Sequence, residues 1–105
     1  MRPIHLVALD KTRPAVVLTR EPVRDHARRV TVAPITSRVR GLSTEVDVGA
    51  MNGLDSPSVI SIDTIMTVDR AQVGRLVGWL LPHQEHALAS AISTAFDLEL
   101  PGRGE

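Results

Sequence analysis

The sequence of 105 residues has no cysteine and almost no aromatic residues. Without cysteine it has no disulfide, no thiol nucleophile and no cysteine-based zinc site, and a reducing compartment is permitted. With one Trp, one Phe and no Tyr, we do not expect stacking of nucleobases on an aromatic platform. The core must therefore be built from Val, Ile, Leu and Ala.

Long apolar runs are also missing from the sequence. None approaches the ~18 residues that a membrane-spanning helix needs, and the run within residues 1–8 is too short for a secretory signal. We therefore expect no membrane association and a cytoplasmic location. The length predicts a single domain over residues 1–100 with a frayed tail at 101–105. Pairing with a second copy would add useful burial to so small a domain.

The chain has no net charge, but its charges are divided unevenly. Residues 1–40 hold nine Lys or Arg against three Asp or Glu, and residues 41–105 hold three against nine. The basic half suits a phosphate-rich ligand, although a solvated arginine-rich surface balanced by the acidic half explains it equally well. The candidates for binding a nucleic-acid backbone are Arg20, Arg28, Arg29, Arg38 and Arg40.

Short β-branched runs bounded by turn residues dominate the first two-thirds of the sequence. They predict strands over residues 4–8, 15–19, 30–33, 44–48, 58–62 and 65–68, a helical turn within 70–75 and a last strand over 76–80. An apolar stripe of Leu88, Ile92 and Phe96 predicts one helix over residues 82–97, with Pro82 at its first position. Gly41 and Gly53 are expected to supply unusual backbone angles in loops.

Two predicted strand ends carry the candidate catalytic residues, Arg13 and Thr36. An arginine and a hydroxyl held on neighbouring strands can grip and polarise one phosphate, as in a nuclease. Each residue also has a purely structural alternative. Arg13 can form a salt bridge to Asp10 or Asp63, and Thr36 can bond its own backbone at a strand end.

Five elements of the sequence occur in a recognisable order. They are Arg-Pro before an apolar strand, a strand ending in Pro-Ile-Thr-Ser, an Asp-Thr segment before Thr-Val-Asp, a Gly-initiated strand and a closing helix. They lie at residues 13–18, 33–37, 62–69, 78–80 and 82–96. With this pattern, over nearly its whole length, the chain resembles the MazF/PemK family of toxin endoribonucleases from bacterial type II toxin–antitoxin modules. The resemblance implies a mainly β fold with α, an SH3-like barrel of twisted antiparallel strands plus a C-terminal helix, assembled as a homodimer.

The resemblance also implies an activity. Family members cleave single-stranded RNA at short sequences without a metal or cofactor, and their targets are messenger RNA and in some cases ribosomal or transfer RNA. The ribose 2′-hydroxyl attacks its own phosphate and leaves a 2′,3′-cyclic phosphate and a 5′-hydroxyl, which requires RNA rather than DNA. Translation and growth are thereby inhibited. A cognate MazE-like antitoxin neutralises the toxin by laying a disordered tail across the dimer groove.

Within this family Arg13 and Thr36 are expected to be catalytic, and three further residues are candidate supports. Ser37 can share the task of Thr36, and Asp63 can orient Arg13 or contact RNA, although a buried carboxylate capping a turn is the default for Asp63. His26 is a candidate general base for which a surface-loop position is favoured, so the base stays unassigned. No metal site is expected, since the helical pair of histidines at 83 and 86 has no third ligand.

The chain departs from the family pattern before Arg13. Most members have a Gly-rich loop of about a dozen residues there, whereas here residues 9–12 alone separate Ala8 from Arg13. In this it resembles the short-loop mycobacterial MazF toxins, and an open groove that admits folded RNA is a hypothesis. Ser61 stands where some plasmid-encoded relatives use an arginine, so a mechanism that depends on that arginine does not transfer.

Two other functions remain open at this point. A non-catalytic toxin of the same fold binds a protein such as gyrase through a Trp-Gly-Ile-like end, which is absent here, and Trp79 is expected in the core or an interface. A plain RNA-binding module would keep the basic half without requiring Arg13 and Thr36.

Overall fold

The structure is a computed structural model that describes residues 1–98. Seven strands and one long helix near the C-terminus make up most of its regular structure, so the expected fold class of mainly β with a C-terminal helix is confirmed. The tail predicted at 101–105 lies outside the described residues. The elements in order are β1 (Pro3–Ala8), β2 (Thr12–Val17), α1 (Glu21–Arg24), β3 (Arg29–Thr36), β4 (Glu45–Val48), η1 (Ala50–Asn52), β5 (Ser58–Ser61), η2 (Ile62–Thr64), β6 (Met66–Asp69), η3 (Arg70–Gln72), β7 (Val73–Trp79) and α2 (Pro82–Ala95).

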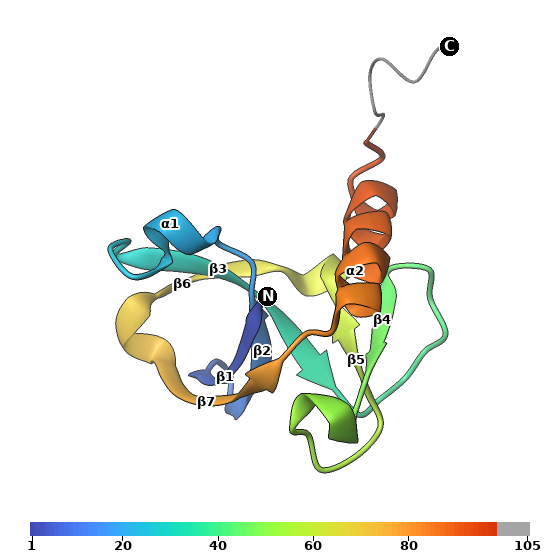
Figure 1. The fold of residues 1–105 in the computed structure, drawn as a ribbon, viewed down its shortest axis with the longest axis horizontal. Helices are drawn as coiled ribbons and strands as arrows, with labels where there is room; N and C mark the ends of the chain where they lie inside the picture. The colour runs from blue at the N-terminus through green and yellow to red at the C-terminus, as the bar shows by residue number, and fades with distance from the viewer. Residues whose placement is uncertain (99–105) are drawn as a thin grey trace.

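The strands form one antiparallel sheet in the order β4-β5-β3-β2-β1-β7, with β6 added to β3. In Figure 1, β1, β2, β3, β6 and β7 form a ring, while α2 stands to one side next to β4 and β5. The long strand β3 runs from the ring to the side where α2 lies. Its first half pairs with β6, and its end pairs with β5. Pro34 lies between the two pairings, where no partner strand needs the N–H that proline lacks.

The central strands are buried on both faces, and each face has its own apolar core. Val16 and Ala33 belong to the cluster that packs under α2, where Leu88 is buried. Val17 and Val32 point the other way, into the cluster inside the ring. Because successive side chains alternate between faces, a strand covered on both sides needs a continuous apolar run, as the sequence has at these strands.

Three predicted strand boundaries differ from the observed ones by three residues, and the others agree to within two. The second strand begins at Thr12 rather than residue 15 because its first residues pair with β1. The third continues to Thr36 rather than residue 33 because its end pairs with β5. The last begins at Val73, since the predicted helical turn is a 3₁₀ turn that ends at Gln72. Arg13 and Thr36 therefore lie within strands instead of beside them.

Two buried amide side chains join the start of α2 to the rest of the fold. The Asn52 Nδ2 donates to the Trp79 carbonyl at 2.8 Å and to the Gln84 Oε1 at 2.6 Å. The Gln84 Nε2 in turn donates to the Asp47 carbonyl at 3.2 Å and to the Asn52 Oδ1 at 3.0 Å. This mutual bonding satisfies polar groups that would otherwise be costly in the interior, and it ties η1, β4 and β7 to the helix.

Candidate active site

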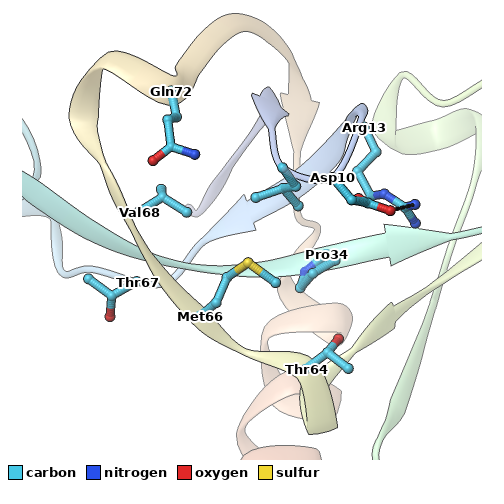
Figure 2. Close-up of a pocket in the computed structure, with 9 residues that line it drawn as sticks. Asp10, Arg13, Pro34, Thr64, Met66, Thr67, Val68 and Gln72 are labelled. Carbon is cyan, nitrogen blue, oxygen red and sulfur yellow. Dashed lines mark hydrogen bonds and ion pairs between the residues drawn. The ribbon is translucent and has the colours of Figure 1, made fainter.

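Arg13 lies on β2 and is oriented by one neighbouring carboxylate. Its Nη2 donates to the Asp10 Oδ2 at 3.1 Å, and Figure 2 shows the two side chains pointing toward each other. The Arg13 side chain is 26% exposed, and its buried Nε has no hydrogen-bond partner within residues 1–98. A guanidinium has five N–H donors, so the contact with Asp10 leaves most of them available to a ligand.

The pKa of Asp10 lies below its ordinary value of 3.8. A backbone hydrogen bond from Lys11 is the main cause; desolvation opposes it by raising the pKa, and the positive charge of Arg13 lowers the pKa further. A lowered pKa keeps the carboxylate ionised at neutral pH. Asp10 is therefore a fixed negative charge that aims the Arg13 guanidinium.

Thr36 ends β3 with its hydroxyl already oriented. The Thr36 Oγ1 accepts a hydrogen bond from the Arg38 N–H at 3.1 Å, which is the local backbone contact expected as its structural alternative. A hydroxyl has one hydrogen to donate and two lone pairs to accept with. The contact with Arg38 uses one lone pair and leaves the hydrogen free for an oxygen of a ligand.

Arg13 lies where two hollows meet. The first, of about 300 Å³, brings together Arg13, Thr36, Arg38, Arg40 and Asp63, and we call it the phosphate cavity. The second, of about 550 Å³ and drawn in Figure 2, is lined by apolar side chains that include Met66, together with Asp10. Arg13, Pro34 and Thr64 line both. A ligand could therefore extend to both sides of the guanidinium.

Two arginines of the phosphate cavity keep their guanidinium donors available to a ligand. Within residues 1–98 the guanidinium groups of Arg38 and Arg40 have no ion pair and no hydrogen bond. The carboxylates of the same cavity are engaged elsewhere, since Asp63 accepts from the Thr44 hydroxyl at 2.7 Å and Glu45 accepts from backbone N–H groups. Such a site favours an anion with several acceptor oxygens.

Comparison with known proteins identifies the family. Residues 6–96 match the model of the PemK-like, MazF-like toxin of type II toxin–antitoxin systems. The chain belongs to this toxin family. It is 59% identical over 99 residues to the protein named endoribonuclease MazF3 of Mycobacterium tuberculosis, covering 94% of this chain and 96% of that one. The resemblance found in the sequence is thus confirmed.

Solved structures show the same toxin fold. The Mycobacterium tuberculosis toxin MazF-mt6 superposes with a TM-score of 0.92 at 57% identity, over 94% of this chain and all of that one. An endoribonuclease from a mycobacterial species, solved in complex with its cognate antitoxin, has a TM-score of 0.83 at 22% identity, with 94% and 95% covered. At that identity the likeness concerns the fold.

Of the three residues predicted to support the toxin's site, one lies in the phosphate cavity. Asp63 lines that cavity, but it is exposed in the η2 turn rather than buried, and its carboxylate bonds Thr44 rather than Arg13. Ser37 is exposed and follows Thr36 without lining the phosphate cavity. His26 is exposed in the loop after α1, outside that cavity.

The predicted RNA-binding arginines of this family member divide into two groups. Arg38 and Arg40 lie beside Arg13 in the phosphate cavity. Arg28 and Arg29 line a separate, shallower hollow next to Asp69, and Arg29 pairs with Asp69 at 3.5 Å. Arg20 is exposed just before α1 and lines neither of these hollows. The basic half of the sequence is therefore not one continuous surface.

Some residues of the site were not singled out from the sequence. Glu45 and Thr64 line the phosphate cavity, and they approach it through strand pairing and a turn that no local motif indicates. In the described part of the chain no three His, Asp or Glu side chains gather as a metal site would require. Among residues 1–98 no helix has the length and apolar character to cross a membrane.

Proposed function

We propose that this protein is the toxin of a type II toxin–antitoxin system and acts as a metal-independent, sequence-specific endoribonuclease on single-stranded RNA. The observation that carries the proposal is the phosphate cavity, in which Arg13 and Thr36 offer free donors beside the unpaired Arg38 and Arg40. The named activity of the 59% identical relative supports it. Cleavage of messenger RNA, or of ribosomal or transfer RNA, would stop translation and growth.

The chemistry follows from where these donors lie. The 2′-hydroxyl of the target nucleotide attacks the adjacent phosphorus, and the O5′ of the next nucleotide leaves. Negative charge grows on the non-bridging oxygens in the transition state, where the Arg13 guanidinium and the Thr36 hydroxyl stabilise it. The products are a 2′,3′-cyclic phosphate and a 5′-hydroxyl. DNA is not cut because it has no 2′-hydroxyl.

The surrounding residues hold substrate and catalyst in place. Asp10 aims Arg13 without titrating near neutral pH. Arg38 and Arg40 bind the phosphates that flank the cleavage point, and the separate hollow with Arg28 and Arg29 offers another place for the RNA backbone.

The protein acts as a homodimer in the cytoplasm, where its RNA substrates are. Leu76 and Trp79 on the edge strand β7 are 45% and 42% exposed, and such apolar side chains on a sheet edge are suited to a second copy. A MazE-like antitoxin with an acidic, apolar tail competes with RNA for the basic surface. The mycobacterial endoribonuclease solved with its cognate antitoxin supports this partner.

The test is incubation of the purified protein with total bacterial RNA in EDTA, beside the Arg13→Ala variant, with new 5′-hydroxyl ends mapped by sequencing. Discrete cuts by the wild-type protein, absent with the variant, are expected. RNA left intact but bound would favour an RNA-binding module. RNA neither cut nor bound would favour a toxin that acts on a protein, and a pull-down for that protein would follow.

A further inference from the structure

We propose that Glu45 is a positioning residue that fixes the β3–β4 loop, residues 37–44, so that Arg38 and Arg40 face the RNA backbone. The inference rests on the proposed function and adds a residue that contacts no substrate itself. It is motivated by an unusual use of a carboxylate. Glu45 lines a cavity with three arginines, yet it forms an ion pair with none of them in the described chain.

The Glu45 carboxylate is bound by three consecutive backbone N–H groups. Its Oε1 accepts from Gly41 at 2.8 Å and from Leu42 at 3.1 Å, and both oxygens lie 3.2 Å from the Arg40 nitrogen. Hydrogen bonds to an ionised acceptor are roughly twice as strong as neutral ones. Gly41 has a φ of 75°, and this left-handed turn directs successive N–H groups to one point.

Within residues 1–98, the middle of the β3–β4 loop has one further hydrogen bond, from the Glu45 N–H to the Leu42 carbonyl at 3.1 Å, and it does not involve Arg40. The loop is held at its start by the Thr36 hydroxyl, which binds the Arg38 N–H, and at its end by Thr44, which binds Asp63. Between these points Val39 and Leu42 are 55% and 46% exposed, so apolar burial contributes little there. The conformation around Arg40 therefore depends on Glu45.

This arrangement also keeps the arginine donors free for the substrate. A carboxylate in a basic cavity usually pairs with an arginine and occupies its N–H groups. Here the acceptors of Glu45 are occupied by the backbone, and within residues 1–98 Arg38 and Arg40 keep unpaired guanidinium groups. The same carboxylate thus shapes the loop and leaves the arginines available to phosphates.

For Glu45→Gln, the proposal and simple electrostatics predict opposite changes in RNA affinity. Glu45→Gln removes a negative charge from a basic cavity, which by itself tightens RNA binding. It also turns the Oε2 acceptor of the Arg40 N–H into an amide NH₂, and it leaves only a neutral oxygen, a weaker acceptor, for the N–H groups of Arg40, Gly41 and Leu42, which loosens the loop. If Glu45 positions the arginines, Glu45→Gln weakens binding. The matched control is Asp47→Asn, which removes the charge of an exposed carboxylate on the same strand.

The experiment measures binding of a short, randomised, fluorescent 2′-O-methyl RNA at several salt concentrations. This probe cannot be cleaved because its 2′-oxygen carries no hydrogen. We expect Glu45→Gln to weaken binding about fivefold, in the range of one ordinary hydrogen bond. The slope of log affinity against log salt should shrink by about 0.7 for each phosphate that the variant no longer binds. Asp47→Asn should bind as tightly as the wild type or more tightly.

A double-mutant cycle separates the positioning of the arginines from a general effect on the fold. In an Arg38→Ala, Arg40→Ala background, Glu45→Gln should have no further effect on binding. With cleavable RNA, Glu45→Gln should raise KM and leave kcat unchanged, since Arg13 and Thr36 are untouched. If Glu45→Gln does not fold, Gly41→Ala takes its place, because its Cβ meets nothing within 4 Å and disturbs only the backbone angle.

The proposal is overturned if Glu45→Gln binds as tightly as the wild type, or if its weaker binding persists in the double-alanine background. These outcomes differ from a failure of the proposed function. If the proposed function is wrong, the wild-type protein leaves total RNA intact in EDTA, whatever the affinities for 2′-O-methyl RNA are.

Discussion

At the residue scale, the cavity keeps its donors free while fixing their direction. Arg13 gives one N–H to Asp10, and Thr36 accepts from the Arg38 N–H while keeping its own hydrogen. The salt bridge and the local backbone bond were the structural alternatives to catalysis by these residues. Both contacts exist, and both orient a side chain toward the cavity, so the structural and catalytic interpretations are compatible.

Replacing Thr36 by valine removes the hydroxyl and keeps the shape of the side chain. We expect kcat to fall about 10²-fold, the usual cost of one transition-state donor, with a small change in stability because Thr36 is only half-buried. Single-turnover cleavage of a target oligonucleotide measures the effect. Thr67→Val is the control, since Thr67 lines the neighbouring hollow and its hydroxyl bonds only Thr31. Equal rates for both variants would exclude Thr36 from catalysis.

The lowered pKa of Asp10 makes a prediction about pH. Because the folded pKa lies below 3.8, the carboxylate and its ion pair with Arg13 persist from neutral pH down to acid and disappear as pH falls through that pKa. Asp10→Asn should slow cleavage about tenfold, through weaker orientation of Arg13, without changing the shape of the rate profile between about pH 6 and 8. The pH dependence of the cleavage rate, measured for the wild type and for Asp10→Asn, tests both expectations. An inflection near neutral pH that disappears in Asp10→Asn would instead make Asp10 the titrating base.

At the element scale, the site depends on β3 changing partners. The strand pairs with β6 before Pro34 and with β5 after it, and this second pairing carries Thr36 to the cavity. Alternation of β-branched residues predicted that the strand exists, but its end at Thr36 follows from a partner more than 20 residues later. Arg13 and Thr36 were found because each belongs to a local motif. Glu45 and the Asn52–Gln84 pair were not, since their partners are set by tertiary contacts.

The close approach of η1 to β7 gives a prediction about stability. A Cβ at Gly78 would overlap the Asn52 carbonyl oxygen and disturb the buried amide pair. Gly78→Ala should lower the free energy of unfolding by about 2 kcal/mol or more. At Gly49 a Cβ would make an ordinary contact at 3.8 Å, so Gly49→Ala should change stability by less than about 0.5 kcal/mol. Urea unfolding compares the two, and equal midpoints would show that η1 is not held tightly against β7.

At the scale of the whole molecule, a neutral chain presents a basic site. The carboxylates of Glu45 and Asp63 lie in the phosphate cavity, but they bond the backbone and a threonine, so within residues 1–98 they leave the guanidinium donors of Arg38 and Arg40 unpaired. The net charge of the sequence therefore says little about its ligand. The position of each carboxylate determines which arginines remain available to an anion. Family membership and this cavity together support the proposed cleavage of RNA through attack by its own 2′-hydroxyl.

The most direct measurement compares two oligonucleotides that carry the mapped target sequence and differ by one atom. One is all RNA, and the other has a single 2′-deoxy nucleotide on the 5′ side of the cleaved bond. In EDTA the wild-type protein should cut the first to a cyclic phosphate and a 5′-hydroxyl, and should leave the second intact although it binds it. Cleavage of the deoxy oligonucleotide at the same bond would contradict 2′-hydroxyl attack at the Arg13 and Thr36 cavity.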